Sequence, residues 1–322
     1  VEKEEIKKLA SNGLIKIHVS EEPDIFYIRI LAATGADNAE VTIRTDHTNI
    51  TSIKKNGATI LEKPIVRVEE EAKSIWSLEE VLDASKNMPL DNVLPYIQRQ
   101  INYNMAISKE GLENDYGASI GRILLQGDAV SLRTRARASA AAGSDARMNG
   151  CELPVVIVSG SGNQGITASV PVVVYAQALK VSEEKMYRAV LLSDLVTVYL
   201  KQGIGKLSAY CGAVSAGSGS GAGIAYLYGM SDEQIAHVVE NALAINSGII
   251  CDGAKSSCAA KIAMAVEGGL LAFDMAKAEH NFAGGDGIVQ ENADETIAAV
   301  GKIASQGMVD TDKEIINVML GL

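Results

Sequence analysis

The cysteines carry the most distinctive chemistry in this sequence. Cys211 and Cys251 lie 251 − 211 = 40 residues apart in glycine-rich segments, and Cys258 follows 258 − 251 = 7 residues later. The chain has no Cys-x-x-Cys pair and no histidine beside these cysteines, which disfavours zinc. Thiolates from separate segments suit an iron–sulfur cluster, and three of them would leave one iron open as a Lewis acid. The alternative for each is a small buried core residue, which we adopt for Cys151.

Three segments are richer in glycine than ordinary packing requires: residues 159–166, 211–223 and 247–258. A Gly/Ser loop ahead of a helix presents free backbone N–H groups to an anion. Neither nucleotide fingerprint is met, because no Gly-Lys-Ser/Thr is present and the second segment reads Gly-x-Gly-x-Gly. Close helix packing is the alternative explanation. We predict that the backbone of Asn163, Gln164 and Gly165 binds a substrate carboxylate.

Further polar residues lie beside these segments. His47 and Asn49 belong to a dense polar cluster, residues 44–49, which is either a strand terminus or a substrate contact. Lys206 precedes Cys211, and Lys255 follows Cys251. Arg147 is one of several arginines on helical stretches. Such residues usually form a solvated face, but Arg147 could hold a substrate carboxylate through two parallel hydrogen bonds.

Composition limits the class of protein. The 322 residues are 47% hydrophobic, carry a formal net charge of −11 and include four cysteines, too few for a disulfide scaffold. The acidic balance argues against nucleic-acid binding, and the apolar runs are too short to span a membrane. No secretion signal opens the chain, so we expect a cytoplasmic protein acting on a small molecule, with a homo-oligomer left open. Because the sequence does not begin with Met, we expect an N-terminal piece to be missing.

Residues 1–75 have the pattern of a small α+β domain. Alternating residues predict strands at 15–19, 26–30, 40–44 and 50–54. Asn56-Gly57 predicts a hairpin turn whose return arm covers 58–68. The opening helix is expected to pack on one face of this antiparallel sheet.

Residues 76–322 are expected to form a large all-helical domain that holds the cluster and the catalytic residues. Ser77 with Glu80 has the spacing of a capping box. Helices are predicted at 78–85, 89–109, 115–127, 130–147, 169–179, 182–200, 231–245, 254–277 and 291–303. Many of them are built from Ala, Gly, Ser and Met, so the core must depend on close backbone approach. The predicted fold is α+β, a small antiparallel sheet domain followed by an Ala/Gly-rich helical domain.

Four of these motifs together resemble the L-cysteine desulfidase family, which is related to the α-chain of the iron–sulfur L-serine dehydratases. They are 161–166 (Ser-Gly-Asn-Gln-Gly-Ile), Cys211-Gly212 with the Ser/Gly run after it, 250–255 (Ile-Cys-Asp-Gly-Ala-Lys) with Cys258, and His47-Thr48-Asn49. The resemblance covers essentially the whole chain.

The resemblance implies an enzyme with a four-iron, four-sulfur (4Fe-4S) cluster that converts L-cysteine to pyruvate, ammonia and hydrogen sulfide without pyridoxal phosphate (PLP). Cys211 and Cys251 match the family's cluster cysteines, and Cys258 matches a ligand of the dehydratase relatives. Full-length relatives also carry a Gly-Cys-Thr-Glu-Pro motif that this sequence lacks. Either the sequence is a fragment, or a partner chain supplies the motif, or the protein is degenerate.

The chemistry leaves three functions open. The first is the L-cysteine desulfidase, because an open iron binds a thiolate better than a hydroxyl, which favours L-cysteine as substrate. The candidate base for the Cα proton is Lys206, Lys255 or His47. The second function is an L-serine dehydratase-type deaminase. The third is an inactive or truncated subunit with a binding or scaffold role.

Overall fold

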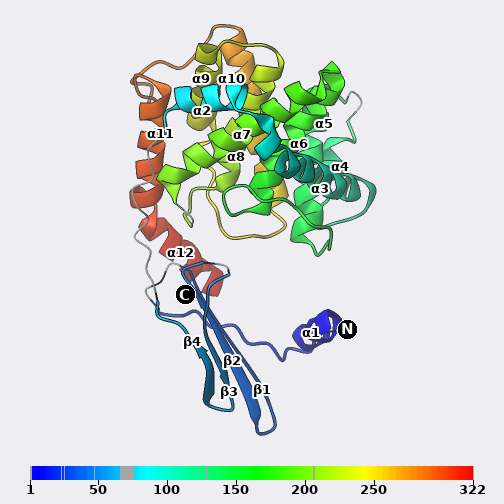
Figure 1. Cartoon of the computed structure of the whole chain (residues 1–322), viewed down its shortest axis with the longest axis vertical. Helices are drawn as coiled ribbons and strands as arrows, with labels where there is room; N and C mark the ends of the chain where they lie inside the picture. The colour runs from blue at the N-terminus through cyan, green and yellow to red at the C-terminus, as the bar shows by residue number, and fades with distance from the viewer. Residues whose placement is uncertain are drawn as a thin grey trace. The chain divides into compact units, whose positions relative to one another are not determined.

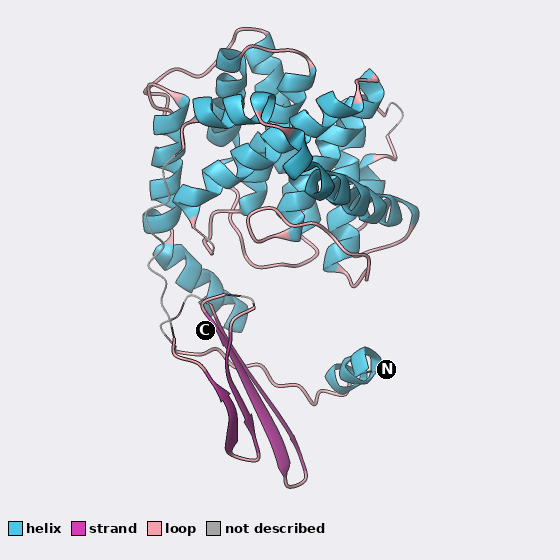
Figure 2. Cartoon of the chain, in the orientation of Figure 1, coloured by secondary structure: helices cyan, strands magenta, loops and turns pink. Residues whose placement is uncertain are grey.

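The structure is a computed structural model that describes residues 2–22, 24, 26–46, 48–65, 76–127, 130–205 and 207–321. The chain divides into two compact units, Val1–Ser74 and Ile75–Leu322. The first contains the sheet and the second is helical (Figure 2). This arrangement confirms the predicted α+β fold class.

The sheet of the first unit is a four-stranded antiparallel meander in the order β1-β2-β3-β4. Its strands are β1 (Tyr27–Thr34), β2 (Asp37–Arg44), β3 (Ile50–Lys55) and β4 (Ala58–Glu62). The predicted hairpin is present, because Asn56 and Gly57 both have positive φ, 50° and 80°, as a tight two-residue turn requires. The return arm is shorter than predicted, and residues 66–68 lie outside the described residues.

Two expectations for this unit are wrong. Residues 15–19 form no strand: Ile17 is 90% exposed, and no neighbouring strand pairs with the segment in the described residues. Alternation alone therefore gave a false signal where no partner strand was available. The opening helix α1 (Glu2–Ser11) does not pack on a sheet face, and its apolar residues Ile6 and Leu9 are exposed.

The second unit is a bundle of helices (Figure 1). They are α2 (Leu78–Asn87), a 3₁₀ turn (Leu90–Asn92), α3 (Leu94–Glu113), α4 (Ile120–Leu124), α5 (Leu132–Met148), α6 (Gly162–Leu179), α7 (Glu183–Ile204), α8 (Gly212–Leu227), α9 (Asp232–Asn246), α10 (Cys258–Lys277), α11 (Ala293–Lys302), a π-helical turn (Ile303–Gly307) and α12 (Val309–Leu320). The predicted capping box is confirmed, since Ser77 accepts from the Glu80 N–H and the Glu80 carboxylate accepts from the Ser77 N–H. The segment predicted as helix 115–127 forms only the short α4.

Residues 212–223 lie outside the helices predicted from the sequence, and here the structure differs most. They form most of α8, a buried helix. A Cβ at Gly217 would lie 2.3 Å from the Ala265 carbonyl oxygen, and one at Gly221 would lie 2.8 Å from the Gly269 carbonyl oxygen. These glycines therefore let two helix backbones touch, which explains the run better than a loop does.

The same contacts fix the direction of the helices around α8. Gly212 lies against Gln164 and Gly223 against Val172, so α6 runs parallel to α8. Of the contacts between α8 and α10, the later one on α8 is also the later one on α10: Gly217 lies against Ala265, and Gly221 against Gly269. Helix α10 is therefore parallel to α8 as well. The N-termini of α6, α8 and α10 consequently lie at one end of the bundle.

Helix α7 runs the opposite way. Gly219 of α8 lies against the Ser193 carbonyl, whereas Gly223, one turn later, lies against the earlier residue Ala189. The C-terminal end of α7 therefore arrives at the end of the bundle where α6, α8 and α10 begin.

Candidate active site

A short antiparallel bridge brings two of the candidate cysteines together. Tyr210 pairs with Ile250 immediately before Cys211 and Cys251. The Cys211 N–H donates to the Ile249 carbonyl at 3.2 Å, and the Cys251 N–H donates to the Ala209 carbonyl at 2.6 Å. Each thiol has the largest effect on the other's pKa, so residues far apart in the sequence form one sulfur pair.

The electrostatics of the pair are unequal. The interaction between the two thiols raises the pKa of Cys211, which is buried, and lowers the pKa of Cys251 to about 6. Lys261, on the first turn of α10, donates to the Ile250 carbonyl at 2.9 Å, and its charge favours both thiolates. One thiolate is therefore favoured at neutral pH, and a thiolate is the form that binds a soft metal.

Cys258 lies at the same end of the bundle, as the first residue of α10, but it does not join the pair. Its sulfur accepts from the Lys255 N–H at 3.5 Å and donates to the Gly253 carbonyl at 3.6 Å. Within the described part of the chain, no group of three or more His, Cys, Asp or Glu side chains comes close enough to hold a metal ion. The cysteines therefore provide two adjacent thiols that could bind a metal and a third thiol at the same end of the bundle.

The predicted anion-binding loop is the first turn of α6. Arg147, at the end of α5, donates to Asn163 Oδ1 at 3.3 Å, and burial lowers the pKa of its guanidinium. The Gly165 N–H is already used, because it donates to the Ser161 carbonyl at 3.1 Å. The earlier N–H groups, those of Asn163 and Gln164, have no acceptor within the helix, as expected at a helix N-terminus. Gly165 itself is required by packing, since a Cβ there would lie 2.0 Å from the Val156 carbonyl oxygen.

Lys201 is a site residue that the sequence interpretation did not identify. It lies near the C-terminal end of α7, is 6% exposed, and has the Cys251 and Cys211 thiolates as its main charged neighbours. Burial lowers the pKa of its ammonium group. The signal in the sequence was a lysine at the spacing of the buried residues Thr197 and Ile204, in an otherwise apolar stretch.

The remaining predicted residues are Lys255, Asn49, His47 and Lys206. Lys255 is partly exposed, with its ammonium 3.8 Å from Asp252 Oδ2. Asn49 belongs to the sheet unit, where its amide donates to the Arg44 carbonyl at 3.0 Å and to Thr45 Oγ1 at 3.1 Å. His47 and Lys206 lie outside the described residues.

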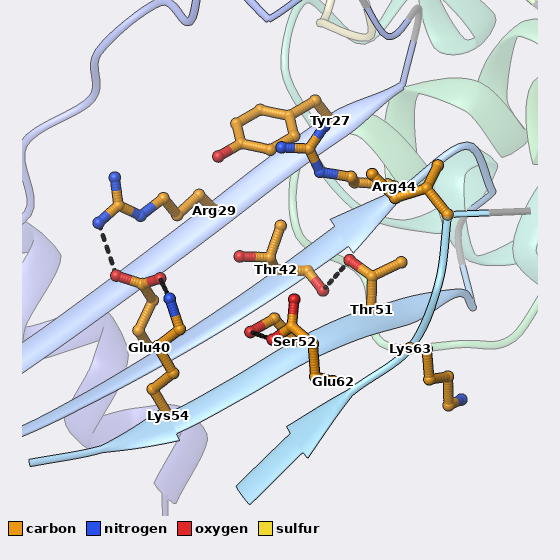
Figure 3. A pocket seen from close by; sticks show the side chains of 11 residues that line it. Tyr27, Arg29, Glu40, Thr42, Arg44, Thr51, Ser52, Lys54, Glu62 and Lys63 are labelled. Carbon is orange, nitrogen blue, oxygen red and sulfur yellow. Dashed lines mark hydrogen bonds and ion pairs between the residues drawn. The ribbon is translucent and has the colours of Figure 1, made fainter. Parts of the chain in front are cut away.

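A separate hollow of about 350 Å³ lies on the polar face of the sheet (Figure 3). Several of its charged groups pair with one another: Arg29 pairs with Glu40 at 2.6 Å, and Lys54 lies 3.7 Å from the same carboxylate. The Ser52 hydroxyl donates to Glu62 at 2.9 Å. Because these groups already form ion pairs and hydrogen bonds with one another, we place the candidate chemistry at the cysteine pair instead.

A search of the described residues finds no helix with the length and apolar character needed to cross a membrane.

The helical unit thus carries a cysteine pair at the end of the bundle where α6, α8 and α10 begin. Residues 29–317 match the family described as serine dehydratase alpha chain, and the chain belongs to this family. The match confirms the resemblance inferred from the sequence motifs.

The chain is also similar to curated proteins of the UPF0597 group. It is 47% identical to one from Desulfitobacterium hafniense over 324 residues, which cover 99% of this chain and 75% of that protein. It is 44% identical to one from Lachnoclostridium phytofermentans, covering 98% of this chain and 76% of the relative. A relative from Treponema denticola is also 44% identical, with coverage of 98% and 77%.

Proposed function

We propose that this protein is an iron–sulfur-dependent L-cysteine desulfidase, a carbon–sulfur lyase that converts L-cysteine and water to pyruvate, ammonia and hydrogen sulfide. Membership of the serine dehydratase alpha chain family supports a lyase that acts on a small amino acid. The observation that carries the proposal is the pair formed by Cys211 and Cys251 at the shared N-terminal end of α6, α8 and α10.

The residues at this end suit a 4Fe-4S cluster. Cys211 and Cys251 would be two of its ligands, and Cys258 is the proposed third. Helix N-termini favour negative charge, which thiolate ligands and a substrate carboxylate both carry. When bound, the cluster would supply an open, soft Lewis acid for the sulfur that leaves the substrate.

The chain's own groups would hold the substrate and move its proton. The N–H groups of Asn163 and Gln164, together with Arg147, would bind the carboxylate. A base removes the Cα proton as the carbon–sulfur bond breaks, and the aminoacrylate product then hydrolyses to pyruvate and ammonia. Lys201 is our first candidate for that base because it is buried beside the pair.

The bases predicted from the sequence, Lys255, Lys206 and His47, remain alternatives to Lys201. Asn49 remains a proposed substrate contact.

The test is product formation by the anaerobically purified protein, with L-cysteine and L-serine offered separately. The proposal expects sulfide and pyruvate in equal amounts from L-cysteine, with a larger kcat/KM than for L-serine. A larger kcat/KM for L-serine would instead support the L-serine dehydratase-type function, which the family name favours. No pyruvate from either substrate would contradict both and favour the inactive or scaffold subunit.

A further inference from the structure

Seven buried side-chain atoms have no hydrogen-bond partner among the described residues, and three of them belong to neighbours of one thiol. These three are the side-chain oxygen of Gln164 (Oε1), the phenol oxygen of Tyr210 and the hydroxyl oxygen of Ser215. The three residues are only 7%, 2% and 0% exposed. Because an unpaired buried polar atom is destabilising and uncommon, a cluster of them indicates that a ligand completes their bonds.

All three residues adjoin Cys211. Tyr210 immediately precedes it, and the pKa of its phenol is raised by burial and by the neighbouring thiolate. Ser215 lies one helical turn after Cys211, on α8. Gln164 touches the residue that follows Cys211, since a Cβ at Gly212 would lie 2.4 Å from Gln164 Nε2.

The chemistry of these atoms is complementary to the backbone of an α-amino acid. An amide oxygen only accepts hydrogen bonds, whereas a serine or tyrosine hydroxyl can donate one. An α-amino acid offers an ammonium group that donates and, one carbon away, a carboxylate that accepts. The positive ends of α6 and α8 favour a carboxylate there, and in such surroundings an ammonium group needs a specific acceptor.

We propose that Gln164, Tyr210 and Ser215 form the recognition site for the backbone of the α-amino-acid substrate. The Gln164 side-chain oxygen accepts from the substrate ammonium. The two hydroxyls donate to the carboxylate, in addition to the N–H groups and Arg147 proposed above for the same group. The ligand class rests on the proposed function, but the site makes no use of the leaving group. It therefore selects α-amino acids as a class, and the cysteine pair beside it would select among their side chains.

The experiment measures binding rather than turnover, with L-alanine and propionate as probes. L-alanine has no leaving group, and propionate is the same carboxylate without the ammonium. Calorimetry on the anaerobically purified protein is expected to show that Gln164→Met weakens L-alanine binding about tenfold and leaves propionate binding within about twofold. Ser215→Ala and Tyr210→Phe are expected to weaken both probes by about tenfold.

Ser218→Ala is the matched control, because the Ser218 hydroxyl is buried in the same helix but already donates to the Val214 carbonyl at 3.0 Å. It should bind both probes as the parent does. Equal losses of L-alanine and propionate binding in Gln164→Met, no change in either, or no binding of L-alanine by the parent would each overturn the proposal.

The pyruvate assay separates this inference from the proposed function. A parent protein that binds L-alanine through Gln164 but forms no pyruvate would retain the recognition site and refute the desulfidase. If the parent degrades L-cysteine but Gln164→Met binds L-alanine and propionate in the same ratio as the parent, the desulfidase stands and the recognition site is refuted.

Discussion

The thiols of Cys211 and Cys251 form a pair because a single backbone bridge joins the residues that precede them. The two cysteines belong to different helical elements: Cys211 is the N-cap of α8, and Cys251 lies in the loop before α10. The pair is therefore fixed by the parallel packing of α8 on α10. That packing in turn depends on the small residues along both helices.

This dependence predicts that a methyl group at Gly217 destabilises the fold. Gly217→Ala would place Cβ 2.3 Å from the Ala265 carbonyl oxygen, a backbone atom that cannot move without shifting α10. We expect the free energy of unfolding to fall by about 1–3 kcal/mol, measured by urea denaturation. Gly248→Ala is the control, because nothing lies within 4 Å of its Cβ position. Equal stability of the two variants would contradict the packing argument.

A second prediction concerns Asp145, a buried carboxyl in α5. Burial raises its pKa to about 6 from an ordinary value of 3.8, while one oxygen accepts from the Gly121 N–H at 2.9 Å. Because the folded state holds the proton more tightly, this group favours folding below about pH 4, and that contribution is lost as pH rises to about 6. Asp145→Asn keeps an acceptor for Gly121 and removes the titration.

The stability of Asp145→Asn relative to the parent should therefore increase between pH 4 and pH 7, by about 1–3 kcal/mol. Denaturant unfolding at several pH values measures this difference. A difference that does not change with pH would show that Asp145 is ionised in the folded protein throughout this range.

A third prediction compares two lysines. Lys201→Met removes a buried ammonium beside the cysteine pair, so we expect pyruvate formation from L-cysteine to fall about 100-fold or more. Lys255→Met changes a partly exposed group that already faces Asp252, and a smaller loss is expected. When the substituted lysine is the base, exchange of the substrate Cα proton with deuterated water should fall in parallel with pyruvate formation. A larger effect on exchange in Lys255→Met would transfer that role to Lys255.

The sequence predicted the α+β class, most helices and the cysteines that pair, but not how the helical elements come together. The run from Gly212 to Gly223 resembles a loop because glycine and serine are poor helix formers. It becomes helix only because neighbouring backbones need glycine at the contacts, a tertiary effect that a local pattern does not contain. Lys201 escaped notice for a related reason: only the antiparallel direction of α7 brings it to the pair.

Cys258 is another residue whose surroundings the sequence pattern did not predict. Its spacing from Cys251 suggested a third ligand, yet its sulfur bonds with the Lys255 N–H and the Gly253 carbonyl. A sequence interval fixes how far apart two residues are along the chain, not where a thiol points. We therefore expect Cys258→Ala to reduce iron binding less than substitution of either member of the pair, as measured by iron analysis after reconstitution.

The central claim is that Cys211 and Cys251 hold an iron–sulfur cluster, and iron content tests it most directly. The parent, Cys211→Ala, Cys251→Ala and the control Cys151→Ala, whose half-buried thiol packs against the core, would be reconstituted anaerobically with ferrous iron and sulfide. Bound iron and the sulfur-to-iron charge-transfer absorbance would then be measured. We predict full loading of the parent and of Cys151→Ala, and loss of most iron and absorbance in the other two. Parent levels of iron in both Cys211→Ala and Cys251→Ala would contradict the account.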